Sequence, residues 1–346
     1  MKAPGAKVWC WAAALFLALP AANAPAGGER VQQVLILDSQ AGNPYDEIRA
    51  ALAAALAGYG YVEGRNLRSS LRVIGNDVAS GESILREELQ RQRYDVVYAG
   101  GTAATIAARN VLYGQAQQAV VFAAATDPVG IGVIKDFASK PPANFTGISY
   151  PVPVKSRLRF LRQLLPQARS IGIIYADMPQ SRSYNAWLQQ LVDSDPEFRD
   201  LKLEFRPVSL VTGENGDRLM AEAARRHVQA LDAGVDVFLK PNDQMGTRRY
   251  FSEMVYKTAS KPLLGMVRDD VMAHWGATGV IYPAHGAIGR QAARMIRDLL
   301  QGAEVAAIAP EWPGEYGFAV DLVKARKFGL SVPVEILQMA GDNIVK

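Results

Sequence analysis

The sequences YDVVYAGGTAATIAARN, at residues 94–110, and AVVFAAATDPVGIGVIKDF, at residues 119–137, decide the fold. Each begins with an apolar run of strand length, continues through a short turn, and ends in a segment of helical composition. Two successive strand–turn–helix units predict parallel strands that are buried on both faces. We therefore expect an α/β fold with strands at residues 95–99 and 120–123.

The turns after these two strands are candidate binding positions, because ligands bind beyond the carboxyl ends of the strands in open parallel sheets. Thr102 is expected to be the N-cap of a helix over residues 103–110. Asp127 is expected to cap the next helix, which Pro128 opens. The backbone amides that follow Gly101 would form an anion site.

Length and composition point to a protein of two domains. The chain has 346 residues, of which 49% are hydrophobic and 21% are charged, as in ordinary soluble α/β proteins. Because single cores rarely grow beyond roughly 250–300 residues, this length predicts more than one core. The formal net charge is only +4 and no basic block occurs, so the composition gives no support for nucleic-acid binding.

The first 26 residues predict a signal peptide. Lysines precede the apolar run VWCWAAALFLALPAA, and residues 22–24 and 24–26 both have the small-x-small pattern of a cleavage site. An uncleaved anchor is the alternative, although the run is shorter than the about 20 residues that span a bilayer. Cys10, the one cysteine, lies in this run, so the mature chain would contain no thiol for a disulfide, a metal or catalysis. We expect a periplasmic protein that is cleaved near residues 24–26.

The rest of the chain contains two series of strands that alternate with helices. Proline-rich joints at residues 141–142, 151–153 and 310–313 interrupt the alternation. The first series predicts one lobe with four parallel strands and the second series predicts a lobe of the same design; the expected strands are at residues 31–37, 67–73, 95–99 and 120–123, and then at 170–175, 203–208, 235–239 and 262–267. A helix at residues 286–300, followed by a strand at 318–321, indicates that the chain crosses between the lobes more than once.

These features predict two lobes with parallel sheets, joined by a hinge with several crossovers. Beyond the signal peptide at residues 1–26, we expect lobe 1 to comprise residues 27–149 and 284–309. Lobe 2 is expected to comprise residues 150–283 and 310–346.

The motifs of common catalytic and cofactor sites do not occur in the sequence. The three histidines, His227, His274 and His285, are scattered and lack the clustered ligands that zinc needs. The chain has no GxxxxGK[ST] phosphate loop and no GxSxG nucleophile elbow. Asp269 and Asp270 are adjacent, so we interpret them as part of a solvated loop. We therefore expect a binding protein with no catalytic residue, metal or cofactor.

Several segments occur in an order and spacing that match one known family, although no single segment is specific. They are GYVEGRN (60–66), GGTAAT (100–105), VVFAAATDPVGIG (120–132), NFTGIS (144–149), LLPQARSIGIIY (164–175), PNDQ (241–244), GRQAARMIRDLLQG (289–302) and AVDLVKARKFGLSVP (319–333). Together they make nearly the whole mature chain resemble the ABC-transporter substrate-binding proteins of the tryptophan/tyrosine-binding type. This resemblance implies the type I periplasmic binding fold, in which two Rossmann-like lobes are joined by three crossover strands and hold a ligand in a cleft.

The resemblance also implies a set of ligand-binding residues in the loops that face this cleft. With neighbouring candidates, they are Ser39, Gln40, Tyr45, Gly101, Thr102, Ala103, Thr126, Asp127, Tyr175, Asn242, Asp243, Asp269 and Tyr282. Asp243 is the candidate counter-charge for a ligand ammonium, and the amides and hydroxyl near Thr102 are candidates for a carboxylate. Tyr45 either stacks on the ligand or packs against its own helix. Tyr175 either lines the cleft or belongs to the core.

One segment departs from the family pattern. Relatives often carry an acidic–aromatic pair before Leu-Gly-Arg-Gln, whereas this chain has IYPAHG at residues 281–286. The departure removes an acid and inserts residues at a joint that lines the cleft, so the ligand need not be an aromatic amino acid. We interpret His285 as a joint residue rather than a ligand contact.

The resemblance predicts the periplasmic solute-binding component of an ABC importer. Its partners would be a small ligand, such as an amino acid or a related carboxylate, and an inner-membrane ABC permease. We expect a monomer that binds no nucleic acid. A ligand-sensing module for a membrane signalling receptor is the alternative, because its binding chemistry would be the same. An exported enzyme is disfavoured by the missing catalytic motifs, and a repressor by the missing DNA-binding headpiece and the export signal.

Overall fold

A computed structural model describes Met1, residues 30–213 and residues 215–346. Apart from Met1, the predicted signal peptide at residues 1–26 lies outside the described residues, together with its cleavage sites and Cys10. Among the described helices, none combines the length and apolar character that crossing a membrane requires.

Within the described residues, the first sheet has five parallel strands in the order β2-β1-β3-β4-β5. The strands are β1 (Gln32–Asp38), β2 (Leu67–Val73), β3 (Val96–Gly100), β4 (Ala119–Ala125) and β5 (Phe145–Ser149). This is one strand more than the four predicted, because Phe145–Ser149 pairs with β4. β3 lies in the middle and is buried at every position, which explains its continuous apolar sequence.

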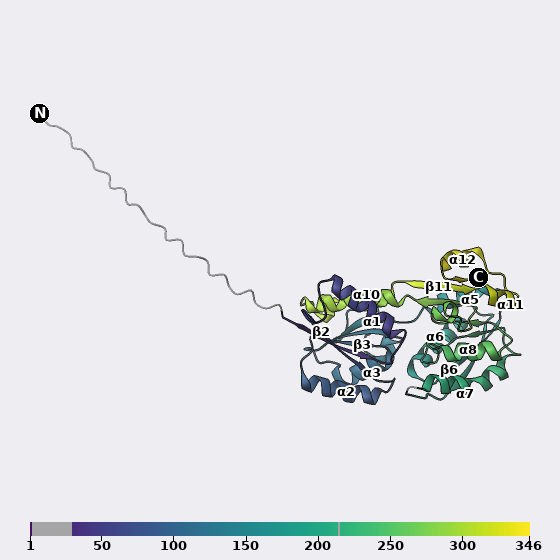
Figure 1. The fold of residues 1–346 in the computed structure, drawn as a ribbon, viewed down its shortest axis with the longest axis horizontal. Coiled ribbons are helices and arrows are strands. Elements are labelled where there is room, and N and C mark those ends of the chain that lie inside the picture. The colour runs from purple at the N-terminus through teal and green to yellow at the C-terminus, as the bar shows by residue number, and fades with distance from the viewer. Residues whose placement is uncertain (2–29, 214) are drawn as a thin grey trace. The chain divides into compact units, whose positions relative to one another are not determined.

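Helices cover both faces of this sheet (Figure 1). They are α1 (Tyr45–Gly58), α2 (Val78–Arg91), α3 (Thr102–Leu112), the short α4 (Pro128–Ile131) and α10 (His285–Leu300). Apolar residues of α1 and α10 pack with Val34 and Ile36, whereas those of α2 and α3 pack with Leu35 and Leu37. The alternation of side chains along β1 therefore builds a core on each face of the sheet.

Within the described residues, the second sheet has seven strands in the order β12-β11-β10-β9-β8-β6-β7. They are β6 (Ser170–Ala176), β7 (Lys202–Val208), β8 (Val237–Leu239), β9 (Leu263–Leu264), β10 (Gly279–Pro283), β11 (Tyr316–Asp321) and β12 (Ile344–Val345). Strands β6 to β10 are parallel, and β11 runs antiparallel to β10. The parallel part, β7-β6-β8-β9-β10, repeats the order of the first sheet.

Helices also surround the second sheet. They are α5 (Val154–Leu164), α6 (Pro179–Ser194), α7 (Gly216–Leu231), α8 (Arg249–Thr258), α9 (Asp269–Met272), α11 (Leu322–Lys327) and α12 (Val334–Ala340), while the 3-10 turn η1 (Val305–Ala307) lies beside β5. We call the first sheet with α1–α4 and α10 the first lobe, and the second sheet with its helices the second lobe. The residue boundaries predicted for the lobes stay a prediction.

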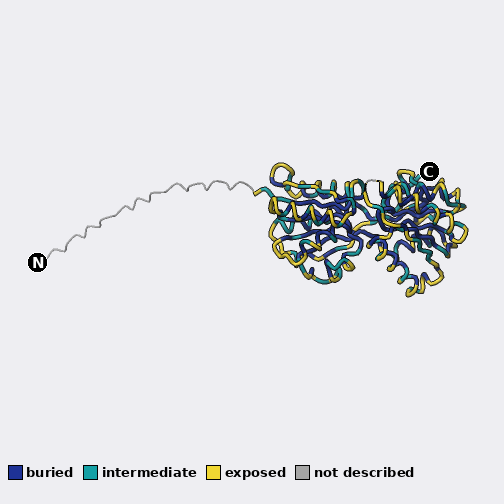
Figure 2. Tube along the Cα trace, turned by 90° about the horizontal axis from the view of Figure 1, so that it is seen from below, coloured by how far each residue is buried: buried dark blue, intermediate teal, exposed yellow. Residues whose placement is uncertain are grey.

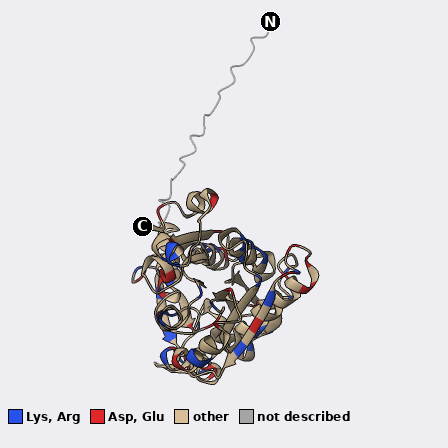
Figure 3. Ribbon diagram, turned by 90° about the vertical axis from the view of Figure 1, so that its right-hand side faces the viewer, with Lys and Arg blue, Asp and Glu red and all other residues tan. Residues whose placement is uncertain are grey.

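In both lobes the buried residues are mainly apolar, and most charged residues lie at the surface. Buried positions follow the strands, and exposed positions lie on the outer turns (Figure 2). Along the ribbon in Figure 3, positively and negatively charged residues are interspersed. Some form exposed ion pairs, such as Arg159 with Glu197 at 2.8 Å. Because exposed pairs contribute only about 0–1 kcal/mol each, the stability of the lobes rests on their apolar cores.

Helix α10 packs on α1 of the first lobe, although it directly follows β10 of the second sheet. Gly289 permits this approach, since a Cβ there would lie 2.3 Å from the backbone oxygen of Ile48 and 2.7 Å from Cβ of Ala51. The chain then returns to the second sheet at β11. It therefore crosses between the lobes after β5, after β10 and before β11.

Replacing Gly289 with alanine is expected to lower the free energy of unfolding by about 1–3 kcal/mol, the usual cost of overpacking. The added methyl group would meet backbone atoms of α1, so α10 would have to shift. Gly58→Ala is the matched control, because no atom lies within 4 Å of its added Cβ. Denaturant unfolding followed by circular dichroism measures both variants. An unchanged midpoint for Gly289→Ala would contradict the packing described.

Candidate functional site

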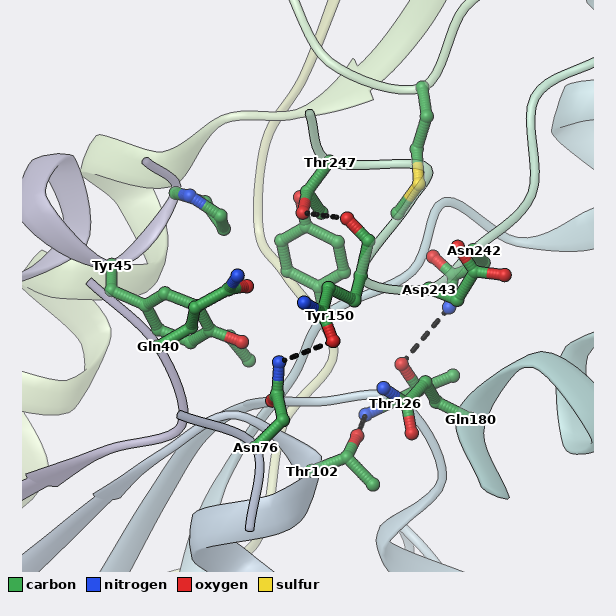
Figure 4. Close-up of a pocket in the computed structure, with 14 residues that line it drawn as sticks. Gln40, Tyr45, Asn76, Thr102, Thr126, Tyr150, Gln180, Asn242, Asp243 and Thr247 are labelled. Carbon is green, nitrogen blue, oxygen red and sulfur yellow. Dashed lines mark hydrogen bonds between the residues drawn. The ribbon is translucent and has the colours of Figure 1, made fainter. Parts of the chain in front are cut away.

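The strand order reverses at corresponding places in the two sheets, between β1 and β3 and between β6 and β8. Loops leave such a point in opposite directions and form a crevice at the carboxyl ends of the strands. Residues from both crevices line one pocket, which we call the cleft pocket (Figure 4). They are Gln40, Pro44, Tyr45, Asn76, Thr102, Ala124, Thr126, Tyr150, Gln180, Asn242, Asp243, Gln244, Thr247 and Met266.

The wall formed by the first lobe depends on a close approach that only glycine allows. Gly101 has a φ of 91°, and a Cβ there would lie 2.5 Å from Oγ of Ser39 and 2.6 Å from Oη of Tyr45. Ser39 Oγ also accepts a hydrogen bond from the backbone N–H of Ala104 at 2.9 Å. Ser39 and Gly101 therefore support Tyr45 at the wall, while Ala103 belongs to the core below α3.

The predicted N-cap at Thr102 is wrong by one position, because the positive φ of Gly101 turns the chain into α3 one residue earlier. Thr102 is the first residue of α3, and its hydroxyl accepts a hydrogen bond from the N–H of Thr126 at 3.2 Å. The cap prediction for Asp127 is confirmed, since its Oδ1 accepts from the N–H of Gly130 at 2.7 Å. Asp127 lines two neighbouring cavities rather than the cleft pocket.

The end of β4 is bent where it reaches the cleft pocket. Ala124 has a φ of 58°, and the register between β4 and β5 shifts between Ala123 and Ala125. A residue with a side chain in this left-handed region costs of order 1–3 kcal/mol, and such residues gather at functional sites. The bulge brings both Ala124 and Thr126 to the pocket wall.

The wall formed by the second lobe is built around Asp243. Its Oδ2 accepts a hydrogen bond from the N–H of Ala176 and its Oδ1 accepts one from the N–H of Gly246, each at 2.8 Å. The carboxylate therefore ties the end of β6 to the loop after β8. Burial raises the pKa of Asp243 to about 7. Each carboxylate oxygen has a second lone pair, so Asp243 can still accept from a ligand.

The interpretation of Asp269 and Asp270 as a solvated loop is wrong for Asp270, which is completely buried. Its carboxylate forms an ion pair with Lys240 and accepts hydrogen bonds from Ser252 Oγ and from the N–H groups of Met266 and Val267. Asp269 and Asp270 both belong to α9, an element that the sequence did not predict. This helix turns the carboxylate of Asp270 inward.

The buried ion pair fixes one end of the loop that carries the second wall. Lys240 Nζ also donates to the backbone oxygen of Arg248 at 2.9 Å, so both ends of the segment 240–248 meet at one ammonium. Burial lowers the pKa of Lys240, while Asp270 opposes this shift. Arg157 donates to the backbone oxygens of Lys240 and Gly265. Two buried cationic side chains, Lys240 and Arg157, therefore fix the backbone of this loop.

Hydrogen bonds connect the lobes across the cleft pocket. Asn242 Nδ2 donates to Thr126 Oγ1 at 3.0 Å, and Asn76 Nδ2 donates to Gln244 Oε1 at 3.1 Å (Figure 4). Arg248, which lines a neighbouring cavity, donates to the backbone oxygens of two first-lobe residues, Ala41 and Asn43. In each of these contacts one lobe supplies the donor and the other the acceptor, so the contacts exist only in the closed arrangement.

The predicted ligand-binding residues divide into two groups. Those that line the cleft pocket are Gln40, Tyr45, Thr102, Thr126, Asn242 and Asp243. Ser39, Gly101 and Ala103 lie behind its walls, whereas Asp127 lines two neighbouring cavities. Tyr175 packs edge-on against Phe205, and Tyr282 lies over Gly317 of the neighbouring strand. Asp269 lines two other cavities. For all of these residues, contact with a ligand stays a prediction.

Sequence reasoning missed part of the pocket lining, namely Pro44, Asn76, Ala124, Tyr150, Gln180, Gln244, Thr247 and Met266. Asn76 and Gln180 follow β2 and β6, so their place at carboxyl strand ends was an available signal. Gln244 and Thr247 continue the loop that holds Asn242. Among the described residues, Gln244 Nε2 is a buried donor without a hydrogen-bond partner.

Asp270→Asn is expected to lower the free energy of unfolding by about 3–5 kcal/mol, because it leaves Lys240 buried without its counter-charge. The double variant with Lys240→Met should lose less than the sum of the two single losses. Asp269→Asn is the matched control and should stay within about 0.5 kcal/mol of the unaltered protein. Denaturant unfolding measures Asp270→Asn, Lys240→Met, the double variant and Asp269→Asn. If the losses of the two single variants add up to that of the double variant, Lys240 and Asp270 are not coupled.

Comparison with known proteins agrees with the resemblance. Residues 34–195 match the family model of ABC transporter substrate binding proteins. A tyrosine-binding protein of Clostridioides difficile (strain R20291) is 29% identical over 130 residues, which cover 38% of this chain and 36% of that protein. The match thus spans about a third of that relative's length.

Solved structures share the fold across almost the whole chain. A conserved domain protein from Vibrio cholerae has a TM-score of 0.77 at 21% identity and covers 92% of this chain and 100% of its own. An ABC domain in complex with L-Trp from Streptococcus pneumonia has a TM-score of 0.75 at 19% identity, with coverages of 91% and 100%. A solute binding protein from Bacillus halodurans with bound myo-inositol has a TM-score of 0.57 at 12% identity, with coverages of 85% and 96%.

These likenesses confirm the type I periplasmic binding fold, with two α/β lobes and largely parallel sheets. The family model adds a likeness in sequence to this likeness in fold. Residues 34–195, a little under half of the chain, are thus similar in sequence to the ABC transporter substrate binding proteins.

Proposed function

We propose that this chain is the periplasmic solute-binding component of an ABC importer and captures an amino acid or a related carboxylate in the cleft pocket. The observation that carries this proposal is that both sheets direct their switch-point loops to one pocket lined by hydroxyl, amide and carboxyl groups. The relative named a tyrosine-binding protein and the L-Trp complex support an amino acid as the ligand. The signal-peptide pattern supports export, and an inner-membrane permease would receive the solute.

The two walls suit the opposite charges of an amino acid. Helix α3 begins at Thr102 beside the pocket, and the N-terminus of a helix favours a carboxylate. Asp243 on the facing wall can accept from an ammonium, which would favour its ionised form. A zwitterion interacts with both walls only when the lobes approach, so its binding shifts the population toward the closed arrangement.

The size of the cleft pocket indicates that the lobes must move to admit such a ligand. Its cavity volume is about 30 Å³ in this arrangement. A cavity that takes up benzene measures about 150 Å³, so an amino acid needs more room than the closed walls leave. We therefore infer that ligand enters an open form and that the lobes then close around it.

Titration calorimetry of the chain from residue 27 onward, with L-tyrosine, L-tryptophan and other amino acids, tests the proposed ligand class. At least one should bind with a Kd of about 1 μM or below. Asp243→Asn should weaken this binding by about 10-fold or more, the scale of a hydrogen bond to a charged group. Asp127→Asn is the control, since Asp127 lies outside the pocket lining. The proposal fails if no amino acid or carboxylate binds and native mass spectrometry finds no co-purified molecule.

Arg248→Gln is expected to favour the open form, because it removes the charged donor that reaches Ala41 and Asn43. The radius of gyration from small-angle X-ray scattering should rise, and affinity for the ligand should fall by about 10-fold. Arg249→Gln is the matched control, since Arg249 is exposed and stacks only on its neighbour Tyr250. If Arg248→Gln scatters and binds like the unaltered protein, Arg248 does not contribute to closure.

A further inference from the structure

A buried histidine connects the cleft pocket to a surface carboxylate. His285 begins α10 and is 8% exposed. Its Nδ1 lies 2.7 Å from Oε2 of Glu47 on α1, and its Nε2 lies 3.3 Å from Oη of Tyr150. Tyr150 lines the cleft pocket, whereas Glu47 and His285 do not. His285 also belongs to the segment 281–286, where the chain departs from the family pattern.

We propose that Glu47 and His285 orient the hydroxyl group of Tyr150, so that the cleft pocket presents a hydrogen-bond acceptor at that position. Glu47 and His285 are then positioning residues that select which ligand group binds there. This inference rests on the proposed function only in assigning the cleft pocket to a ligand.

The direction of each hydrogen bond follows from what the groups can donate. An ionised carboxylate only accepts, so Glu47 requires the proton of a neutral His285 ring to be on Nδ1. Nε2 is then an acceptor, and the Tyr150 hydroxyl must donate to it. The remaining lone pair of the Tyr150 oxygen is left for the ligand. The complementary ligand group is therefore a donor, such as an ammonium or a hydroxyl, and not a carboxylate.

The surroundings support an ionised Glu47 and a protonated Tyr150. The hydrogen bond from His285 lowers the pKa of Glu47, so this carboxyl is ionised at neutral pH. Burial raises the pKa of Tyr150 well above its usual range, so Tyr150 remains a phenol. The other charged or titratable groups that face this chain of hydrogen bonds come from several elements and are Tyr45, Arg248, Arg268, Asp269 and Asp270.

Protonation of His285 would reverse the arrangement. Both ring nitrogens would then donate, so the Tyr150 oxygen would accept from Nε2 and its proton would turn toward the pocket. A ligand ammonium at Tyr150 would meet a donor instead of an acceptor, so its affinity would fall as the pH decreases.

Nitrogen-15 NMR of the histidine rings tests the proposed tautomer without any ligand. The His285 signals are assigned by their loss in His285→Gln, and they should show the neutral ring protonated at Nδ1. Glu47→Gln should move part of the population to the Nε2–H tautomer, because a glutamine amide can also donate. Asp46→Asn, an exposed neighbour on α1, should leave the signals unchanged. A ring protonated at Nε2 in the unaltered protein would overturn the proposal.

Calorimetry with L-tyrosine and L-tryptophan tests the effect on binding. Tyr150→Phe should weaken the tighter ligand by about 10-fold, and Glu47→Gln should weaken it several-fold. Glu47→Gln should have no effect in the Tyr150→Phe background, because its influence passes through the hydroxyl. The affinity ratio between the unaltered chain and Tyr150→Phe should grow with pH, and this ratio cancels the titration of Asp243. Asp46→Asn is again the control.

The outcomes separate the two proposals. Equal losses from Glu47→Gln in both backgrounds, or a ratio that does not change with pH, would overturn the role of His285 while leaving amino-acid binding intact. Failure of every amino acid to bind would overturn the proposed function, and the NMR measurement would still decide the tautomer.

Discussion

Hydrogen bonds donated by second-lobe side chains to first-lobe oxygens hold the cleft in its closed arrangement. Asn242 donates to the hydroxyl of Thr126, and Arg248 donates to the backbone oxygens of Ala41 and Asn43. Such bonds contribute about 0.5–1.5 kcal/mol each, or about 1.5–3 kcal/mol when the donor is charged. Their sum is similar in size to the about 5.5 kcal/mol that moves an equilibrium from 1:99 to 99:1. Breaking these bonds opposes opening, and a solute that contacts both walls would add its own preference for the closed form.

These donors can close the cleft only because the loop that carries them is fixed. The Lys240–Asp270 ion pair and the hydrogen bond from Lys240 to Arg248 hold its two ends, and Asp243 ties its middle to the end of β6. On the facing lobe, the positive φ angles of Gly101 and Ala124 shape the strand ends. Each wall is therefore cross-linked within its own lobe, and the proposed closure would change the distance between the walls rather than their internal structure.

The sequence was sufficient to predict the fold class and most strands and helices, because buried parallel strands and amphipathic helices have regular patterns. It could not locate α9 or α12, whose few residues show no period. Thr102 was misplaced at the cap because the backbone angle of Gly101 decides where α3 begins. Asp270 looked solvated because its partner, Lys240, is distant in sequence.

The lining of the cleft pocket could be predicted from the sequence only in part, since six of its fourteen residues were among the candidates. Gln40, Thr126 and Asp243 could be predicted, since each follows a strand at its carboxyl end. Tyr150 and Gln244 also follow strands, but their hydrogen bonds join residues far apart in the chain, and no local pattern records those contacts. The placement of polar groups between the lobes is a property of the tertiary structure.

Closure on a solute can be measured as a distance between the lobes. The one cysteine is Cys10, so spin labels can be attached to Ser83→Cys on α2 and Ala223→Cys on α7, two exposed positions, in a chain that starts at residue 27. Double electron–electron resonance should show a broad, longer distance in the free protein and a shorter, narrower one with saturating L-tyrosine or L-tryptophan. The same distance distribution with and without a ligand that binds would contradict capture by closure of the lobes.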